Sequence, residues 1–529
     1  MLHTPQARRG MVTSPHHLAS AAGLRVLREG GNAIEATLAM GAMLAVVYPH
    51  MNALGGDGFW LIHRPDQDPI AIDACGGAAH SATPELYHQN GYQSVPWRGP
   101  LAANTVAGTL SGWAEAKKLS EEWGGTLSFQ QILEDAIDSA DNGFPVTASQ
   151  HALTTEKLSE LINQPNFAHT FLIAGKPPLQ GTMMKLPLLA KTLKMIAERG
   201  PLDFYHGDLA HRVARDLQAI GAPVTRDDLE RHRAARKKPL SVKVSGARLF
   251  NFPPPTQGLS SLMILAIFDR LKAKQPESFE HIHGLIEATK QAFLIRDRVI
   301  GDPSCMDKDA QSFLHADMLQ SCANHIDPQK ALPWPYTADK GDTVWLGAID
   351  QNGIAASFIQ SIYFEYGSGC VLPETGILWQ NRGASFQLQG TGHRLIGPGR
   401  KPFHTLNPAM ALFDDGRCMV YGTMGGEGQP QTQSALFSRY GFFNQSLQAS
   451  ITAPRWLLGK TWGENSVTLK LENRFDPALI KALKEAGHDV EILSDFTATM
   501  GHAGAVVKHQ NGLFEAATDP RSDGAALGF

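Results

Sequence analysis

The amino-acid sequence predicts an α+β fold in which sheets and helices form separate layers. Segments with the pattern of strands fall in two groups, one before residue 253 and one after residue 342, and helical segments surround both. At 529 residues, the chain exceeds the ~250–300 residues that one simple core usually organises. It has no internal repeat and no low-complexity tract. Elements grouped in this way favour α+β layers.

The first quarter of the chain is predicted to hold two helices and a strand pair. Ser14 followed by Pro15 is typical of an N-cap and a first helical residue, and the glycines after Glu29 stop the helix. The predicted elements are a helix ending at Glu29, a helix capped by Asn32 that ends before Pro49, a tight turn at 55–58, and strands Phe59–His63 and Pro69–Asp73.

The middle of the chain, from residue 105 to residue 240, is predicted to be mostly helical, with Gly and Pro between the helices. Residues 310–340 are polar and contain several prolines, which predicts a linker or an ordinary surface loop. The other predicted elements are a strand pair in Leu240–Phe252, helices Leu259–Leu271 and Glu280–Asp297, hairpins between Thr343 and Val420, helices Thr432–Asn444 and Pro477–Ala486, and a final hairpin in His502–Leu513.

The most informative segment begins at Thr343. Alternating residues after it predict a strand, and Asn352-Gly353 predicts the turn of a hairpin. If that turn is a two-residue loop, Thr343 lies across from residue 362, with the Ser361 hydroxyl and the Tyr363 ring beside it. A Thr at the first position of a strand, with these neighbours, suits catalysis by an N-terminal Thr whose own α-amine is the base. The competing interpretation is a routine β-branched strand residue.

The composition gives little support to a nucleic-acid or membrane partner. The net charge is −4, the isoelectric point is about 6.6, and basic runs are short. The five cysteines are scattered and show no metal-binding spacing, which fits a reducing compartment. The first residues lack an apolar signal-peptide core, and the most apolar helix, Ala33–Tyr48, is too short to span a bilayer. These features predict a cytoplasmic protein without cofactor or metal.

A series of motifs resembles signatures of the γ-glutamyltransferase family. Each motif is weak alone, but they follow one another in the family's order over nearly the whole chain. They are GGNAIEA at 30–36, GGDGF at 55–59, Pro253-Pro254-Pro255, Gly301-Asp302-Pro303, Asp342-Thr343 with its hairpin, FEYGSG at 364–369, ETGIL at 374–378, KPFHTLNP at 401–408, GTMGG at 422–426, Ala453-Pro454-Arg455 and Asp519-Pro520-Arg521.

The resemblance implies a four-layer αββα sandwich of the N-terminal nucleophile hydrolase type. It also implies self-cleavage between Asp342 and Thr343. The products would be a helix-rich large chain, 1–342, and a small chain, 343–529, that remain one intertwined unit. A dimer of such processed heterodimers is compatible with the resemblance.

The resemblance further implies roles for individual residues. Thr343 would attack the Asp342 carbonyl during maturation and the substrate amide afterwards, with its freed amine as base. Ser361 would take the place of a second Thr that hydrogen-bonds the nucleophile. The backbone N–H groups of Gly425 and Gly426 would stabilise the oxyanion, although a Gly-Gly pair is more often a plain turn.

The differences from the family concern its clamp for a substrate amino acid. The Arg that holds the substrate α-carboxylate is replaced by Cys75, and the Asp that holds the α-amine is replaced by Ser385. Tyr363 takes the place of an Asn, and His404-Thr405 takes the place of a Ser-Ser pair. Both ends of the clamp are therefore missing.

Arg382 falls where the family has a neutral side chain. One Arg in a smaller pocket suits a short carboxylated amide. The resemblance implies oxamate as a candidate, which would be hydrolysed to oxalate and ammonia in purine-nitrogen breakdown. Arg382 could instead pair with Glu374 or Glu365, and His404 could be a packed histidine. The alternative functions are a γ-glutamyl hydrolase or transferase, a cephalosporin-type acylase, and an inactive scaffold, which the intact Thr343 argues against.

Overall fold

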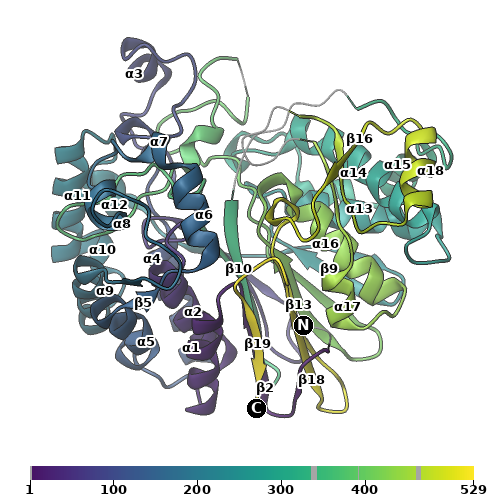
Figure 1. Cartoon of the computed structure of the whole chain (residues 1–529), viewed down its shortest axis with the longest axis horizontal. Coiled ribbons are helices and arrows are strands. Elements are labelled where there is room, and N and C mark those ends of the chain that lie inside the picture. Colours follow the sequence, from purple (N-terminus) through teal and green to yellow (C-terminus); the bar gives the residue numbers. More distant parts are fainter. Residues whose placement is uncertain (1–2, 335–341, 391, 460–465) are drawn as a thin grey trace.

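Two seven-stranded antiparallel sheets lie face to face at the centre of the molecule, and helices cover the outer face of each (Figure 1). The computed structural model describes residues 3–334, 342–390, 392–459 and 466–529. One helical layer lies to the left of the strands in Figure 1 and the other to the right. The order helix, sheet, sheet, helix is the predicted four-layer αββα sandwich, so the predicted fold class is confirmed.

Both sheets combine strands from the two sides of position 342. The first sheet has the order β1 (Gln6–Ala7), β18 (Phe514–Thr518), β17 (Ala503–Lys508), β13 (Cys418–Thr423), β12 (Ala409–Phe413), β9 (Ala247–Asn251), β8 (Leu240–Val244). The second has the order β19 (Ala525–Gly528), β2 (Gly10–Ser14), β10 (Asp342–Asp350), β11 (Ala355–Tyr363), β3 (Asp57–His63), β4 (Ile70–Ala74), β7 (Ala235–Lys237).

Each helical layer has helices that touch its sheet and helices that pack behind them. On the second sheet these are α1 (His17–Arg28), α2 (Ala33–Val47) and α4 (Thr109–Glu122), backed by α5 (Phe129–Asn142) and α9 (Pro187–Arg199). On the first sheet they are α13 (Gly258–Leu271), α16 (Gln429–Phe437) and α17 (Leu447–Thr452), backed by α14 (Phe279–Val299), α15 (Ala316–Asn324) and α18 (Pro477–Glu485).

Smaller elements complete the fold. The short helices are α3 (Pro84–Gln89), α6 (Ala148–Glu156), α7 (Leu158–Leu161), α8 (Phe167–Phe171), α10 (Asp203–His206) and α12 (Arg226–Arg231), and α11 (Asp208–Ile220) lies against α10. The small sheets are β14 (Trp456–Leu458), β15 (Leu469–Glu472) and β16 (Val490–Leu493), and β5 (Phe144–Pro145) with β6 (Met183–Met184).

The apolar side chains form three cores, one in each space between neighbouring layers. The two larger cores each join a sheet to its helices, and the third lies between the sheets. In this third core, Trp345 of β10 packs against Gly422 of β13 and Gly504 of β17. A Cβ atom at Gly422 would lie 2.2 Å from the indole, so only glycine leaves room for it. This contact brings the sheets close together next to the start of β10.

Helix α2 is buried along its whole length beneath the second sheet. A capping box begins it, because the Asn32 side chain accepts from the Glu35 N–H while the Glu35 carboxylate accepts from the Asn32 N–H. In the described part of the chain, no helix combines the length and apolar character needed to cross a membrane.

Two sequence-based expectations about elements were wrong. Helix α1 begins at His17 and is capped by the His16 side chain, whereas Ser14 ends β2, because the strand pairing extends to that residue. The predicted linker contains a 3₁₀ turn, Ala310–Leu314, and α15, whose buried side chains, including Leu319 and Cys322, pack on the helical layer. Its end, residues 335–340, lies outside the described residues.

Candidate active site

Thr343 is the second residue of β10 and is completely buried. Its Oγ1 donates to Ser361 Oγ at 3.4 Å. The same Ser361 oxygen accepts from the Tyr363 N–H at 2.8 Å. The structure therefore brings a second hydroxyl, itself fixed by the backbone, next to the hydroxyl of Thr343.

The hairpin reaches this arrangement by another register than the predicted one. Ala355 pairs with Ile349, so the turn contains three residues, 351–353, and the predicted two-residue Asn352-Gly353 loop is wrong. The longer turn shifts the pairing by one residue. A β-bulge opposite Thr343, where Ser361 and Ile362 of β11 face this one residue of β10, shifts the pairing back. Bulges of this kind occur next to active sites, where they redirect a side chain.

Gly425 and Gly426 follow the end of β13, on the sheet that faces Thr343. Gly347 of β10 packs against Val420 of β13, and Trp345 packs against Gly422. Two residues further along each strand are Thr343 and Met424, and Met424 directly precedes the two glycines. Both glycines have positive φ, +114° and +53°, a conformation that glycine adopts readily, and a loop of two such residues can present consecutive backbone N–H groups to a ligand. Such a pair can bind an oxyanion.

Arg382 is completely buried, and its guanidinium lies over the Tyr363 ring, with Cζ 3.5 Å from the ring centroid. Tyr363 has a φ of +82°, a strained conformation for a non-glycine residue. Arg382 donates to the Phe403 carbonyl at 3.3 Å and to Thr405 Oγ1 at 3.2 Å, while its Nε has no partner in the described chain. These contacts fix the guanidinium while its Nε–H stays available to a ligand.

Among the described residues, no carboxylate forms an ion pair with Arg382. The two candidates from the sequence are engaged elsewhere, because Glu374 pairs with Arg215 and Glu365 lies near Lys157. Burial lowers the pKa of Arg382 to about 10, so the side chain stays charged at neutral pH. A buried cation without an anionic partner is costly, and this favours a site for an anionic ligand.

His404 is also completely buried and donates from Nε2 to Asp57 Oδ2 at 2.9 Å. The other Asp57 oxygen accepts from the N–H groups of Gly76 and Gly108 and from Gln380. Burial and, secondarily, the charge of Arg382 hold the pKa of His404 well below its usual value, so the ring is neutral. Its Nδ1 is then an acceptor, and it has no partner in the described chain.

Among the described residues, two groups of side chains have the residue types of metal ligands. In the first, Asp57, Cys75 and His404 place one ligand atom each within 4.8 Å of the others. Burial raises the pKa of the Cys75 thiol well above its usual value, and Arg382 and Lys401 act on the same thiol. A protonated thiol beside two cations disfavours a divalent metal.

In the second group, His283, Glu287 and His488, the ligand atoms already have protein partners. His283 bonds to His488 and to the Asp327 carbonyl, and Glu287 pairs with Lys290 at 2.7 Å. Neither group fits a resident metal well.

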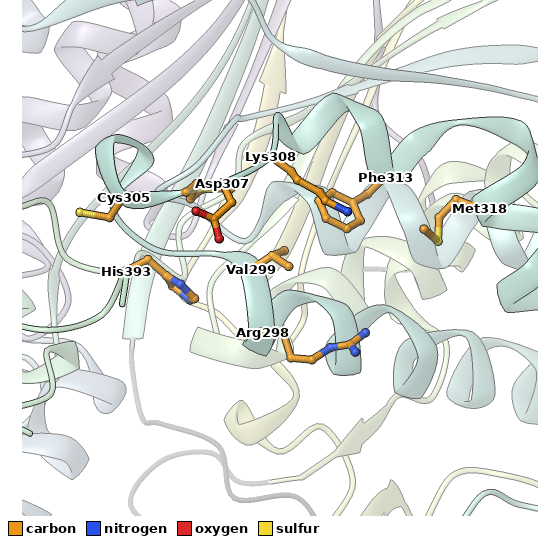
Figure 2. A pocket seen from close by; sticks show the side chains of 9 residues that line it. Arg298, Val299, Cys305, Asp307, Lys308, Phe313, Met318 and His393 are labelled. Atoms are coloured by element: carbon orange, nitrogen blue, oxygen red, sulfur yellow. The ribbon is translucent and has the colours of Figure 1, made fainter. Parts of the chain in front are cut away.

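Outside this region, a pocket lies between the end of α14 and the loop that follows it (Figure 2). Its volume is about 380 Å³. It is lined by Arg298, Val299, Cys305, Met306, Asp307, Lys308, Phe313, Met318 and His393. None of the site residues predicted from the sequence lines it, and its charged side chains are of mixed sign.

Three contacts of the site were not predicted. The first is the hydrogen bond between Asp57 and His404. Asp57 lies in the GGDGF motif, and the available signal in the sequence was a carboxylate between two glycines at the start of a strand. Arg455 and Asp519 come from two further motifs and form a buried pair at 2.5 Å. Arg455 also donates to the Gly501 carbonyl at 2.9 Å, and Gly501 packs behind Gly425. The motifs were visible, but nothing in the sequence shows which of them meet.

Comparison with known proteins agrees with the fold and the motifs. Residues 19–529 match the family model described as gamma-glutamyltranspeptidase. The chain is 55% identical over 521 residues to the oxamate amidohydrolase proenzyme of Klebsiella pneumoniae subsp. pneumoniae, with 98% of each chain covered. It is 40% identical over 522 residues to the glutathione hydrolase-like YwrD proenzyme of Bacillus subtilis, again with 98% of each covered.

A solved structure is similarly close. The crystal structure of cephalosporin acylase from Bacillus halodurans matches with a TM-score of 0.92 at 31% sequence identity, covering 100% of this chain and 97% of that one.

Proposed function

Because the chain belongs to the gamma-glutamyltranspeptidase family of amide hydrolases, we propose that it is a self-processed amidohydrolase of small carboxylated amides. The leading candidate substrate is oxamate, which the enzyme would hydrolyse to oxalate and ammonia. The cytoplasmic location and the role in purine-nitrogen breakdown stay predictions from the sequence.

The observation that carries this proposal is the environment of Arg382. The guanidinium is buried, fixed by Thr405 and the Tyr363 ring, and has no carboxylate partner among the described residues. A ligand carboxylate would supply the missing anion, and a planar guanidinium binds one in a defined orientation. Arg382 acts electrostatically on Cys75, which replaces the family's substrate-binding Arg. The positive charge that the family has at the position of Cys75 would thus be supplied here by Arg382, from another element of the same region.

Maturation would use Thr343 first on the chain itself. Its Oγ1 attacks the Asp342 carbonyl carbon, the peptide nitrogen leaves as the α-amine of Thr343, and an ester links the two residues. Water then hydrolyses the ester. The products are the proposed large chain, 1–342, and small chain, 343–529. That the relatives from Klebsiella and Bacillus are proenzymes supports this step.

Substrate hydrolysis would follow the same geometry. The α-amine of Thr343, with an ordinary pKa of ~7.7–8.0, accepts the proton from Oγ1, which attacks the substrate carbonyl carbon. The N–H groups of Gly425 and Gly426 stabilise the oxyanion, and Ser361 keeps Oγ1 in place. The C–N bond breaks, and the amine returns the proton to the leaving ammonia. Water attacks the oxalyl ester in turn, releasing oxalate and restoring Thr343.

An ammonia-release screen tests this function. Purified protein is given oxamate, malonamate, glutamine and a neutral amide of oxamate's size. We expect the highest kcat/KM on oxamate. A higher kcat/KM on glutamine, or no turnover of any carboxylated amide, would overturn the proposal.

The alternatives are a γ-glutamyl hydrolase or transferase and a cephalosporin-type acylase, of which the fold match to the Bacillus halodurans acylase favours the second. Tyr363 and His404 reduce the room for an amino-acid acceptor, so transfer should be weak. Strong acceleration of acyl release by glycylglycine would favour the transferase, and release of a cephalosporin side chain would favour the acylase.

A further inference from the structure

Gln257 connects two loops of the candidate site. It is completely buried at the N-cap of α13, and its backbone N–H donates to the His404 carbonyl at 2.9 Å. Its side-chain Nε2 donates to the Thr405 carbonyl at 2.8 Å and to the Gly426 carbonyl at 2.9 Å. One amide nitrogen therefore joins the loop of Thr405 to the loop of Gly426.

The orientation of this amide is fixed from behind by helix α14. Gln257 Oε1 accepts from Arg296 Nη1 at 3.0 Å. Arg296 is buried and pairs with Glu427 at 2.6 Å and with Asp297 at 2.8 Å. A flipped amide would turn its oxygen toward two carbonyl oxygens and its NH₂ toward a guanidinium. Only one orientation of Gln257 is therefore compatible with its surroundings.

The two loops carry the two halves of substrate recognition. Thr405 Oγ1 accepts from Arg382, the proposed carboxylate-binding group, and Gly426 follows Gly425 in the proposed oxyanion donor pair. In oxamate, the carboxylate carbon is bonded directly to the amide carbonyl carbon. The guanidinium and the oxyanion donors must then hold neighbouring atoms, and a small change in their separation removes the alignment.

We propose that Gln257 is a positioning residue that fixes the distance between the carboxylate site and the oxyanion donors, and thereby selects two-carbon amides over longer homologues. This inference rests on the proposed function and deepens it. Gln257 acts through the loops of Thr405 and Gly426, to whose carbonyl groups its side chain donates.

The test compares Gln257→Met with the wild type on oxamate, malonamate and succinamate. The carboxylate and the amide are directly bonded in oxamate and are separated by one methylene group in malonamate and by two in succinamate. Met has a similar length but cannot donate to either carbonyl. We expect the ratio of kcat/KM for oxamate to that for succinamate to fall at least tenfold, mainly through kcat on oxamate. Self-cleavage, followed by mass spectrometry, should still occur.

Gln448→Met is the matched control. Gln448 of α17 is similarly buried, and its side chain donates to the Thr518 carbonyl of β18 at 2.9 Å. It should leave the ratio unchanged. If Gln257→Met does not mature, Arg296→Lys loosens the same amide and is measured in the same way.

An unchanged ratio, or an equal loss on all three amides, would show that Gln257 is only structural. A wild-type enzyme that hydrolyses none of the three overturns the proposed function, and this inference with it. A wild type that prefers oxamate beside a variant with an unchanged ratio overturns this inference alone.

Discussion

The proposed substrate class rests on Arg382, whose charge is buried and whose hydrogen-bond partners are neutral. Arg382→Met should lower kcat/KM on oxamate. The corresponding loss of transition-state stabilisation should be about 1.5–3 kcal/mol or more, the usual contribution of a hydrogen bond to a charged group. A neutral amide of similar size should lose far less. Self-cleavage should continue, since it acts on the Asp342 carbonyl.

Arg382→Lys is the matched control for this change. It keeps the charge but not the planar donor pair, so its activity on oxamate should fall between those of the wild type and the Met variant. Equal losses on charged and neutral amides would mean that Arg382 supports only the fold. The carboxylate would then bind elsewhere.

Asp57 gives the site a pH dependence of its own. Burial raises the pKa of this carboxyl to about 6, against the hydrogen bonds from Gly76, Gln380 and Gly108. The group is thus mostly ionised at pH 7 and becomes neutral as the pH falls through about 6. The neutral form accepts a weaker hydrogen bond from His404 Nε2 and no longer fixes the tautomer of the ring.

Two protonations should therefore lower activity on the acid side, that of the Thr343 amine and that of Asp57. A plot of log kcat/KM on oxamate against pH should approach a slope of 2 below pH about 6. In Asp57→Asn the slope should stay near 1, with lower activity at every pH. A wild-type slope of 1 down to pH 5 would contradict a role for ionised Asp57.

At the scale of elements, the contact of Trp345 with Gly422 sets how closely the sheets approach beside Thr343. A methyl group at Gly422 would meet the buried indole at 2.2 Å, so the indole or the strands that carry the two residues would have to move. Gly422→Ala should destabilise the protein by about 1–3 kcal/mol, the usual cost of overpacking a core. It should also slow self-cleavage, because the displaced strand ends carry Thr343 and the glycine pair.

Denaturant unfolding and the fraction of cleaved chain measure the two effects. Gly397→Ala is the control, because its Cβ would meet only the flexible Arg400 side chain at 3.3 Å. A Gly422→Ala variant as stable and as fully cleaved as this control would show that the sheets adjust without cost.

The elements also show what the sequence can and cannot predict. The hairpin after Thr343 follows from local alternation and an Asn-Gly turn, so its existence was predictable. Its register was not, because Gly353, at φ +83°, closes a three-residue turn that Asn-Gly alone does not distinguish. The pair of Asp57 and His404 joins residues 347 positions apart. Such contacts depend on how the sheets pack, which no local pattern encodes.

At the scale of the whole molecule, the two proposed chains cannot separate without breaking both sheets. Beyond position 342, β10 pairs with β2, β11 with β3, β12 with β9, and β18 with β1, all of which precede it. All five cysteines are free, so no disulfide joins the parts. Backbone hydrogen bonds and the shared cores must hold them together after a cut.

The purified wild type should therefore behave as one particle that consists of two chains. Size-exclusion chromatography in high salt should give a single species, because apolar burial and backbone pairing are insensitive to charge screening. A denaturing gel without reductant should resolve two fragments, and mass spectrometry should place their boundary between Asp342 and Thr343. Thr343→Ala should give one inactive chain with the same native elution volume, since the fold does not require the cut. Separation of the wild-type fragments without denaturant would contradict the interleaved sheets. An intact wild-type chain that still hydrolyses oxamate would instead exclude the N-terminal threonine mechanism, because its base exists only after cleavage.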